Sequence, residues 1–317
     1  MKTHLLTLFL LFGSIHSLHS YIGPNDTKKI NKKKEIHSKG ANCEPATAKL
    51  IMEFNNVRAL IEQGGSMFQN RAEQTPAYEV PKGSGLNAIY AGALWMGGVD
   101  VNGQLKLAAL KYRTGNDFWP GPLTVLPGEG SGEANIDPDQ CLAYDKIYTI
   151  RKAEVIRFNI WWSCLTGETT DGCDDITEPT NDELQRIYGW PAHGDVSRGQ
   201  DYYLAPFFDR DEDGTYNPDA GDHPWYDDIL GRNDIKCQID RTVSLYGDET
   251  HWWVFNDKGN IHTETNADPI GMEIRAQAFA FGTNDEINQM TFYNYELINR
   301  GTQTPVSYTH LRAHETR

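Results

Sequence analysis

The sequence predicts an all-β protein, built as a β-sandwich of one or two β-domains with long loops rich in glycine and proline. Two observations lead to this prediction. Short apolar segments alternate with turn residues from about residue 48 onward, and convincing amphipathic helices are scarce. The 317 residues include 8 Trp, 15 Tyr and 12 Phe, which supply enough large apolar side chains for a buried core.

The first 20 residues have the pattern of a cleaved signal peptide. Lys2 precedes the apolar run 5–12, and small residues follow at Ser14, Ser17 and Ser20. This run is too short to cross a bilayer, which takes about 20 residues, and no other run in the sequence is long enough. We therefore expect a secreted or cell-surface protein without a transmembrane segment, recognised by export machinery at residues 1–20. The alternative is a buried N-terminal strand or helix.

The charge is unevenly distributed along the chain. Residues 21–47 are polar and lysine-rich, which is typical of a solvated linker; the alternative is a patch that contacts nucleic acid or a membrane surface. The formal net charge is nevertheless −15, so the body that follows is strongly acidic. Because an acidic body repels phosphate backbones, we expect no nucleic-acid partner. The same charge suits divalent cations.

The β-rich region begins after this linker and is expected to span residues 48–304. The segment 50–61 fits either a helix or a strand, because Asn55-Asn56 interrupts its apolar run. Residues 89–96 predict a strand. Residues 99–112 have the pattern of a hairpin, in which Asn102-Gly103 would supply the two positive-φ residues of a type I′ turn. Prolines and glycines then predict a long loop over 114–139.

More strands are predicted in the second half of the chain. Over residues 155–162, apolar side chains from Ile156 to Trp162 alternate with Arg157 and Asn159, which predicts a strand. The acidic stretch 165–183 is rich in turn residues, and a short helix is expected at 182–188. A subdivision of the β-rich region near 165–200 is an alternative to one continuous region. Further strands are expected at 251–255, 274–281 and 290–298.

The segment 209–222, with the sequence DRDEDGTYNPDAGD, carries the sharpest chemical pattern. Carboxylates occupy positions 1, 3 and 5 of a loop with glycine at position 6, and such oxygen ligands suit calcium. The loop departs from an EF-hand because Ala220 stands at position 12, where a bidentate Glu would bind. The alternative is a solvated acidic turn. The predicted ligands of a structural calcium ion are Asp209, Asp211, Asp213, the carbonyl of Thr215, and either or both of Asp219 and Asp222.

No motif of known catalytic geometry occurs in the sequence. The G-x-S-x-G, P-loop and G-x-G-x-x-G patterns are absent, and the histidines lack H-E-x-x-H spacing. Two tryptophan pairs, Trp161-Trp162 and Trp252-Trp253, could stack on sugars, but one member of each pair is expected to face the core. Carboxylate pairs for glycoside hydrolysis are spatial, so the sequence leaves that alternative open. An enzyme is therefore not indicated.

The chain contains five cysteines, at positions 43, 141, 164, 173 and 237. In an exported protein these residues can oxidise, and Cys164 and Cys173 are close enough in sequence to close a small loop. The alternative is buried free thiols. The odd count leaves one cysteine without a partner in this chain. None has the C-x-x-C spacing of a cysteine-based zinc site.

Several stretches form a recognisable set when taken together: residues 55–59 with 64–65, 78–85, 91–98, 116–122 and 209–224. This set resembles the N-terminal region of large secreted proteins from Gram-negative bacteria that use type IX secretion. The resemblance covers roughly residues 48–304. It implies an extracellular or surface location and export through a C-terminal sorting domain, which this chain lacks. It implies no catalytic residues.

The final segment, residues 305–317, changes abruptly to a composition rich in His and Arg. We expect it to be a non-native tail, and the alternative is a genuine basic tail. The whole sequence thus predicts the N-terminal fragment of a secreted or cell-surface protein with an architectural or adhesive role, whose partners are surface glycans or other surface proteins. The alternative is an accessory region of an extracellular enzyme that binds or degrades polysaccharide, with Trp119 or Trp253 contacting the sugar.

Overall fold

The computed structural model describes residues 41–100, 102–111, 115–125, 134–227 and 244–301, together with the backbone of 312–315. These residues form mainly antiparallel strands, with three short α-helices, so the predicted all-β fold is confirmed. None of the helices described is long and apolar enough to span a bilayer. The predicted signal peptide at 1–20, most of the linker, and Cys237 lie outside the described residues.

The first sheet is built mainly from the N-terminal part of the β-rich region. Its strands follow the order β1-β2-β3-β7-β17, and β6 pairs with β2. The segment 50–61, which fitted either a helix or a strand, forms two strands joined by a turn in which the Asn55 side chain accepts the N–H of Val57 at 3.0 Å. The strands are β1 (Lys49–Met52), β2 (Arg58–Glu62), β3 (Ser66–Met67), β6 (Tyr78–Glu79), β7 (Ile89–Ala93) and β17 (Arg312–Glu315).

The second sheet contains the longest strands, and its order is β10-β14-β15-β16, with β11 also paired to β14. The three strands predicted at 251–255, 274–281 and 290–298 are all present in it. Its members are β10 (Trp119–Pro120), β11 (Tyr148–Arg151), β14 (Glu249–Asn256), β15 (Met272–Ala280) and β16 (Phe292–Asn299).

The predicted hairpin is present as β8 (Trp95–Val99) and β9 (Leu105–Ala109), but its turn differs from the expected type. The Gly103 N–H donates to the Asp100 carbonyl at 2.9 Å, which centres the turn one residue earlier than Asn102-Gly103. The Asp100 carboxylate accepts the N–H groups of Asn102 and Gln104. These bonds stabilise the earlier turn and leave only Gly103 needing a positive φ, of 75°.

The remaining elements are short. A second small hairpin pairs β4 (Gln69–Asn70) with β5 (Thr75–Pro76). Helix α1 (Pro138–Ala143) is capped by Asp137, whose side chain accepts the N–H of Gln140. The described residues also contain three 3-10 turns, which are η1 (Val196–Arg198), η2 (Pro218–Ala220) and η3 (Glu286–Gln289).

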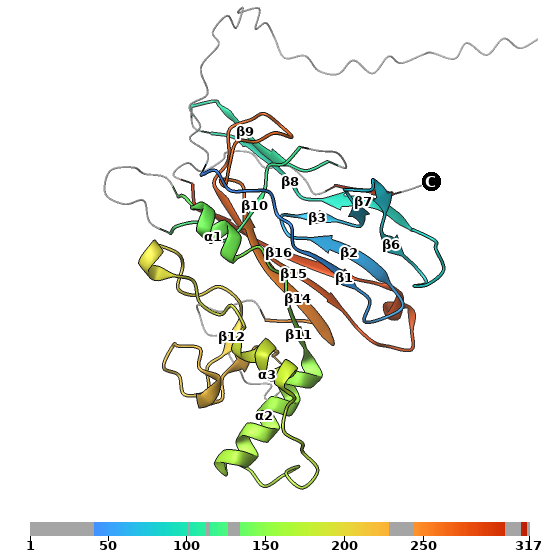
Figure 1. Ribbon diagram of the computed structural model, residues 1–317, viewed down its shortest axis with the longest axis vertical. Coiled ribbons are helices and arrows are strands. Elements are labelled where there is room, and N and C mark those ends of the chain that lie inside the picture. Colours follow the sequence, from blue (N-terminus) through green and yellow to red (C-terminus); the bar gives the residue numbers. More distant parts are fainter. Residues whose placement is uncertain are drawn as a thin grey trace, which may run out of the picture. The chain divides into compact units, whose positions relative to one another are not determined.

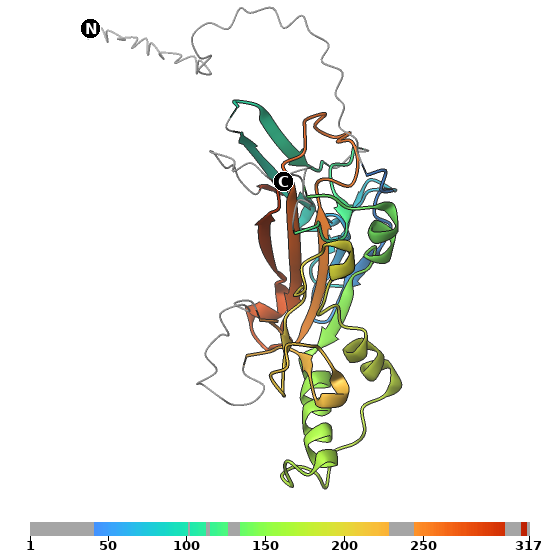
Figure 2. The same ribbon diagram turned by 90° about the vertical axis from the view of Figure 1, so that its left-hand side faces the viewer.

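The two large sheets stack face to face as a sandwich (Figures 1 and 2). The core between them contains Met52 and Ile61 from the first sheet and Trp253, Phe255 and Ile274 from the second. Strand β14 is buried along its whole length, because its opposite face packs into a second core that includes Trp252. The expectation that only one tryptophan of this pair faces a core is therefore wrong: both are buried, since both faces of β14 are covered.

Residues 152–227 pack against the outer face of β14, with helices α2 and α3 at one end of the sandwich (Figure 1), and we call this segment the helical lobe. Helix α2 (Lys152–Thr166) replaces the strand predicted at 155–162. The alternating pattern was misleading because Val155, Phe158 and Trp162 also share one face of a helix, and Val155 and Phe158 are the residues that enter the second core. The short helix expected at 182–188 is confirmed as α3 (Asn181–Tyr188), with a complete capping box at Thr180 and Glu183.

Two disulfides crosslink the described residues. Cys164 and Cys173 close the small loop after α2, as the sequence suggested. The second bond joins Cys43 to Cys141, which are 98 positions apart, and ties the chain before β1 to helix α1. No sequence pattern indicated this pairing.

Candidate metal centre

The acidic loop 209–222 is closed at its base by two short strands. Strand β12 (Phe207–Phe208) pairs antiparallel with β13 (His223–Pro224), and Phe208 lies opposite His223. The residues that follow and precede this last pair are Asp209 and Asp222. Strand pairing therefore brings together two carboxylates, Asp209 and Asp222, that are far apart in the loop.

Three carboxylates converge at this point. Ligand oxygens of Asp209, Asp211 and Asp222 all lie within 4.8 Å of one another. Asp209 and Asp222 are buried, whereas Asp211 is exposed. Two oxygens that share one calcium ion, each at about 2.3–2.6 Å, can be up to about 5 Å apart. The group can therefore hold a metal ion.

The backbone of the loop curls as the sequence pattern requires. The N–H of Gly214 donates to Oδ2 of Asp209 at 2.8 Å, which folds position 6 back over position 1. Gly214 has a φ of 82°, and Glu212 has a φ of 60°. Glycine is also required at position 221, because a Cβ there would lie 2.6 Å from Nε of Arg210 and 3.0 Å from the Trp162 ring.

Asp222 is the most deeply placed carboxylate of the group. Its oxygens accept backbone N–H bonds from Arg210 and Asn217, each at 2.8 Å. Burial raises the pKa of Asp222 to about 6, the charges of Asp209 and Asp211 add to this rise, and the two N–H donors oppose it. A cation at this point would relieve both the desolvation and the repulsion.

The other predicted ligands are turned elsewhere. The Asp213 carboxylate accepts the N–H of Thr215 at 2.6 Å, and the Asp219 carboxylate accepts the hydroxyl of Tyr188. Neither belongs to the converging group. The carbonyl of Thr215 remains a predicted ligand. Of the predicted side chains, Asp209, Asp211 and Asp222 converge, and Asp213 and Asp219 lie outside the converging group.

The loop also holds the helical lobe together. The guanidinium of Arg210 lies 4.7 Å from the centroid of the Trp162 ring and donates to Glu168 at 2.8 Å. The hydroxyl of Tyr216 donates to the Ile187 carbonyl at 2.7 Å. The loop therefore touches α2, the disulfide loop and α3 at once. Sequence reasoning missed these contacts because each joins residues at least 29 positions apart.

The histidines beside the loop are structural. His223 is buried against the Phe208 ring, and burial lowers its pKa to about 4. Its Nδ1 lies 3.0 Å from the Gly221 carbonyl. His193 accepts the N–H of Tyr216 through Nε2 at 2.7 Å, and its Nδ1 lies 3.0 Å from the Tyr202 carbonyl. Since Nε2 is an acceptor and Nδ1 faces a carbonyl, His193 is neutral with its proton on Nδ1.

Comparisons with protein-family models, with curated proteins and with solved structures find no match for this chain.

Proposed function

We propose that this chain is an architectural or adhesive module of an exported protein, and that calcium bound by the acidic loop holds the helical lobe together. The convergence of Asp209, Asp211 and Asp222 is the observation that supports the metal. Calcium is the favoured ion because every candidate ligand is an oxygen and the loop offers no nitrogen or sulfur ligand. The export route through type IX secretion rests on the sequence resemblance alone.

A structural role for the metal follows from what surrounds the site. Arg210, Tyr216 and Asp219 tie the loop to α2 and α3, so fixing the loop also fixes the lobe. The extracellular role is supported by two disulfides, which form and persist in oxidising compartments.

The test is the thermal stability of the whole chain with calcium and with a chelator. A site with a dissociation constant of about 0.1 mM, typical of tighter extracellular modules, gains about 2 kcal/mol in about 5 mM calcium, which raises Tm by about 5 °C. Asp211→Ala should abolish this shift. Asp175→Ala removes one exposed negative charge outside the loop and should leave it intact.

Asp213→Ala distinguishes a metal site made of Asp209, Asp211 and Asp222 from one made of the carboxylates at loop positions 1, 3 and 5. If Asp209, Asp211 and Asp222 form the site, this variant keeps most of the calcium shift. An equal loss in Asp211→Ala and Asp213→Ala would place Asp213 in the site as well. No shift in the unmodified chain at about 5 mM calcium, well above the dissociation constants of such sites, would refute the metal proposal.

Carbohydrate binding is a second candidate function, and one cleft favours it. Trp119 and Trp253, the residues first considered for sugar contact, are 2% and 0% exposed and cannot stack on a ligand. A cleft of about 350 Å³ instead lies between β11 and α3. Tyr148, Asp182 and Gln185 are among the residues that line it. An aromatic ring beside polar groups of this kind suits a polyol such as a sugar.

A glycan array tests this second candidate directly. Binding that is lost in both Asp182→Asn and Gln185→Ala, with Tm unchanged, would support it. These two side chains are exposed, so the variants should fold. Binding that survives both changes, or no binding to any glycan of the array, would leave only the architectural role.

A further inference from the structure

Two carboxylates are fully buried where the β8–β9 hairpin meets the connection between β14 and β15. One of them, Asp257, is 0% exposed. It accepts three backbone N–H bonds, from Ile270 at 2.6 Å, Gly271 at 2.9 Å and Met272 at 2.6 Å. Since all three partners donate, Asp257 is held as the acceptor form, the carboxylate anion.

The second buried carboxylate, Asp117, is also 0% exposed. It accepts the backbone N–H of Ala109 at 3.1 Å and that of Glu264 at 2.9 Å. The hydroxyl of Thr265 donates to it at 2.7 Å. Asp117 therefore joins the end of β9 to the loop after β14, and it too is surrounded by donors.

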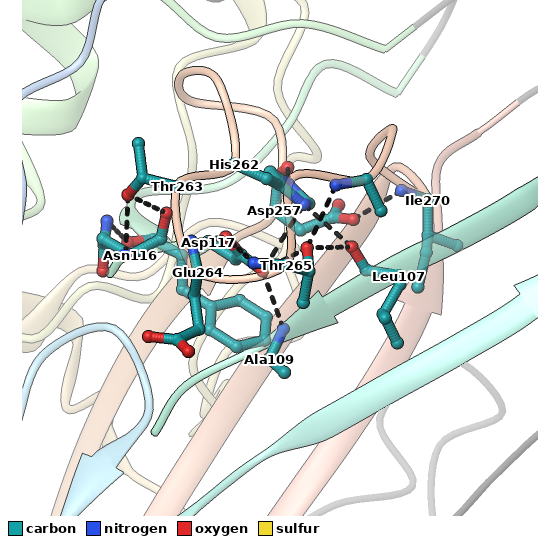
Figure 3. Close-up of polar contacts among 12 residues, drawn as sticks. Leu107, Ala109, Asn116, Asp117, Asp257, His262, Thr263, Glu264, Thr265 and Ile270 are labelled. Atoms are coloured by element: carbon teal, nitrogen blue, oxygen red, sulfur yellow. Dashed lines mark hydrogen bonds and ion pairs between the residues drawn. The ribbon is translucent and has the colours of Figure 1, made fainter. Parts of the chain in front are cut away.

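His262 lies between these groups, as Figure 3 shows. Its ring is buried, Nδ1 lies 2.8 Å from the Leu107 carbonyl oxygen, and Nε2 lies 2.6 Å from the Asp257 carbonyl oxygen. A carbonyl oxygen only accepts hydrogen bonds, so each ring nitrogen must donate. A neutral imidazole carries one N–H, and only the imidazolium can make both bonds.

The charges around the ring favour the same form. Nδ1 of His262 is 3.7 Å from Oδ2 of Asp117. Within the part of the chain that the structure describes, no lysine or arginine forms a salt bridge with either buried aspartate. Lys111 pairs with Glu264 at 2.8 Å and Lys106 with Asp268 at 3.3 Å. The side chain of Lys258, the residue after Asp257, lies against Gly271.

Burying a charge without an opposite charge nearby is unfavourable even when the group is hydrogen-bonded, so a cation at this junction is stabilising. Burial raises the pKa of Asp257, while the charge of His262 and the three N–H donors oppose that rise. The Trp119 ring lies 5.8 Å from the His262 ring, measured between centroids, and carries no charge.

We propose that His262 is a buried imidazolium that compensates Asp117 and Asp257 and makes the junction of the hairpin with the second sheet sensitive to pH. Losing one ring proton would set a lone pair against a carbonyl oxygen and leave the two carboxylates uncompensated. Folding therefore takes up a proton at this site. The stability that this proton provides is lost as pH rises and the ring gives the proton up.

Nitrogen NMR of the histidine rings in the full chain tests this directly. At about pH 7.5, where a free histidine is mostly neutral, both nitrogens of His262 should give the shifts of protonated nitrogen. His193 is a control within the same molecule, since Nε2 accepts a hydrogen bond and should give the shift of an unprotonated nitrogen. Signals are assigned by their absence in His262→Gln and His193→Gln. An unprotonated nitrogen at His262 would overturn the proposal.

Stability measured against pH gives an independent readout. The unmodified chain should lose stability as pH rises and His262 gives up a ring proton. Asp117→Asn removes one of the charges that His262 compensates, so it should shift this loss to lower pH. The same pH dependence in the variant and the unmodified chain would count against the imidazolium.

Discussion

The sandwich and the helical lobe share strand β14, yet they are held together by different kinds of contact. On one face, Trp253 and Phe255 pack against the opposing sheet, and long antiparallel strands satisfy the backbone. On the other face, Trp252 packs against short helices and two-residue strands. The lobe depends on discrete ties, such as the two bonds at 2.8 and 2.9 Å between Arg186 and Glu154.

This difference indicates where each region should fail first. A sheet distributes its stability over many equivalent backbone bonds and a continuous apolar core. A lobe of short elements opens when a few ties are lost, and such regions belong to the low-stability end of a protein. The predictions below test that contrast in order of decreasing effect.

The largest effect is expected on removing the Cys43–Cys141 bond with a double substitution to serine. The chain-entropy relation for a loop of 98 residues gives about 4.7 kcal/mol of lost stability. Because this bond anchors the edge of the sandwich, global unfolding in denaturant should shift as one transition. If only the helical lobe unfolded at lower denaturant concentration, the assignment of this disulfide to the sandwich would be contradicted.

Trp253→Ala should cost about 3–5 kcal/mol, because a fully buried tryptophan leaves a large cavity. Trp252→Ala removes a similar side chain from the other face of β14, and we expect it to open the lobe to proteolysis before the sandwich unfolds. Leu165→Ala is the control, since Leu165 is 68% exposed and should change stability by less than about 0.5 kcal/mol. Identical cleavage patterns for the two tryptophan variants would show that the regions are not separable.

Removing the Cys164–Cys173 bond should have a smaller and more local effect. Its loop spans 9 positions, for which the same relation gives about 2.6 kcal/mol. We expect faster hydrogen exchange in α2 and in loop 209–222, with little change in β15. Uniform exchange over the whole chain would show that the lobe is not an independent unit.

Thr180→Ala should have the smallest effect, about 1 kcal/mol, through loss of the α3 cap. Burial opposes ionisation of Glu183, but hydrogen bonds from Thr180 and the charges of Arg157 and Arg186 outweigh it and lower its pKa. The stability from this carboxylate is present above the usual Glu value of about 4.3 and is lost as pH falls. Thermal melts of the variant should therefore show a weaker loss of stability in acid.

The strands of the second sheet could be predicted because their patterns are local. Residues 251–255 and 274–281 are apolar over the length of a strand and are bounded by turn residues, and both lie inside longer strands of the structure. The segment 155–162 carried an equally clear alternation but fits a helical face as well. Only its packing against the second core decided between the two.

For the candidate sites too, local sequence patterns predict some of the residues and not the others. Local spacing was enough to find Asp209 and Asp211, because alternate residues of one loop converge. The choice of Asp222 required the pairing of Phe208 with His223, which no spacing rule indicates. The charge assigned to His262 required two carbonyl oxygens from positions 107 and 257.

By itself, the sequence predicted the all-β class, the β8–β9 hairpin, the three long strands of the second sheet, the acidic loop and the small disulfide, since each depends on residues close together in the chain. The tertiary structure alone decided that β14 is covered on both faces, that α2 is a helix, which carboxylates meet, and which histidine lies between two buried aspartates. The physical reason is that burial, strand pairing and the electrostatic field at a side chain are set by segments that meet only after the chain has folded.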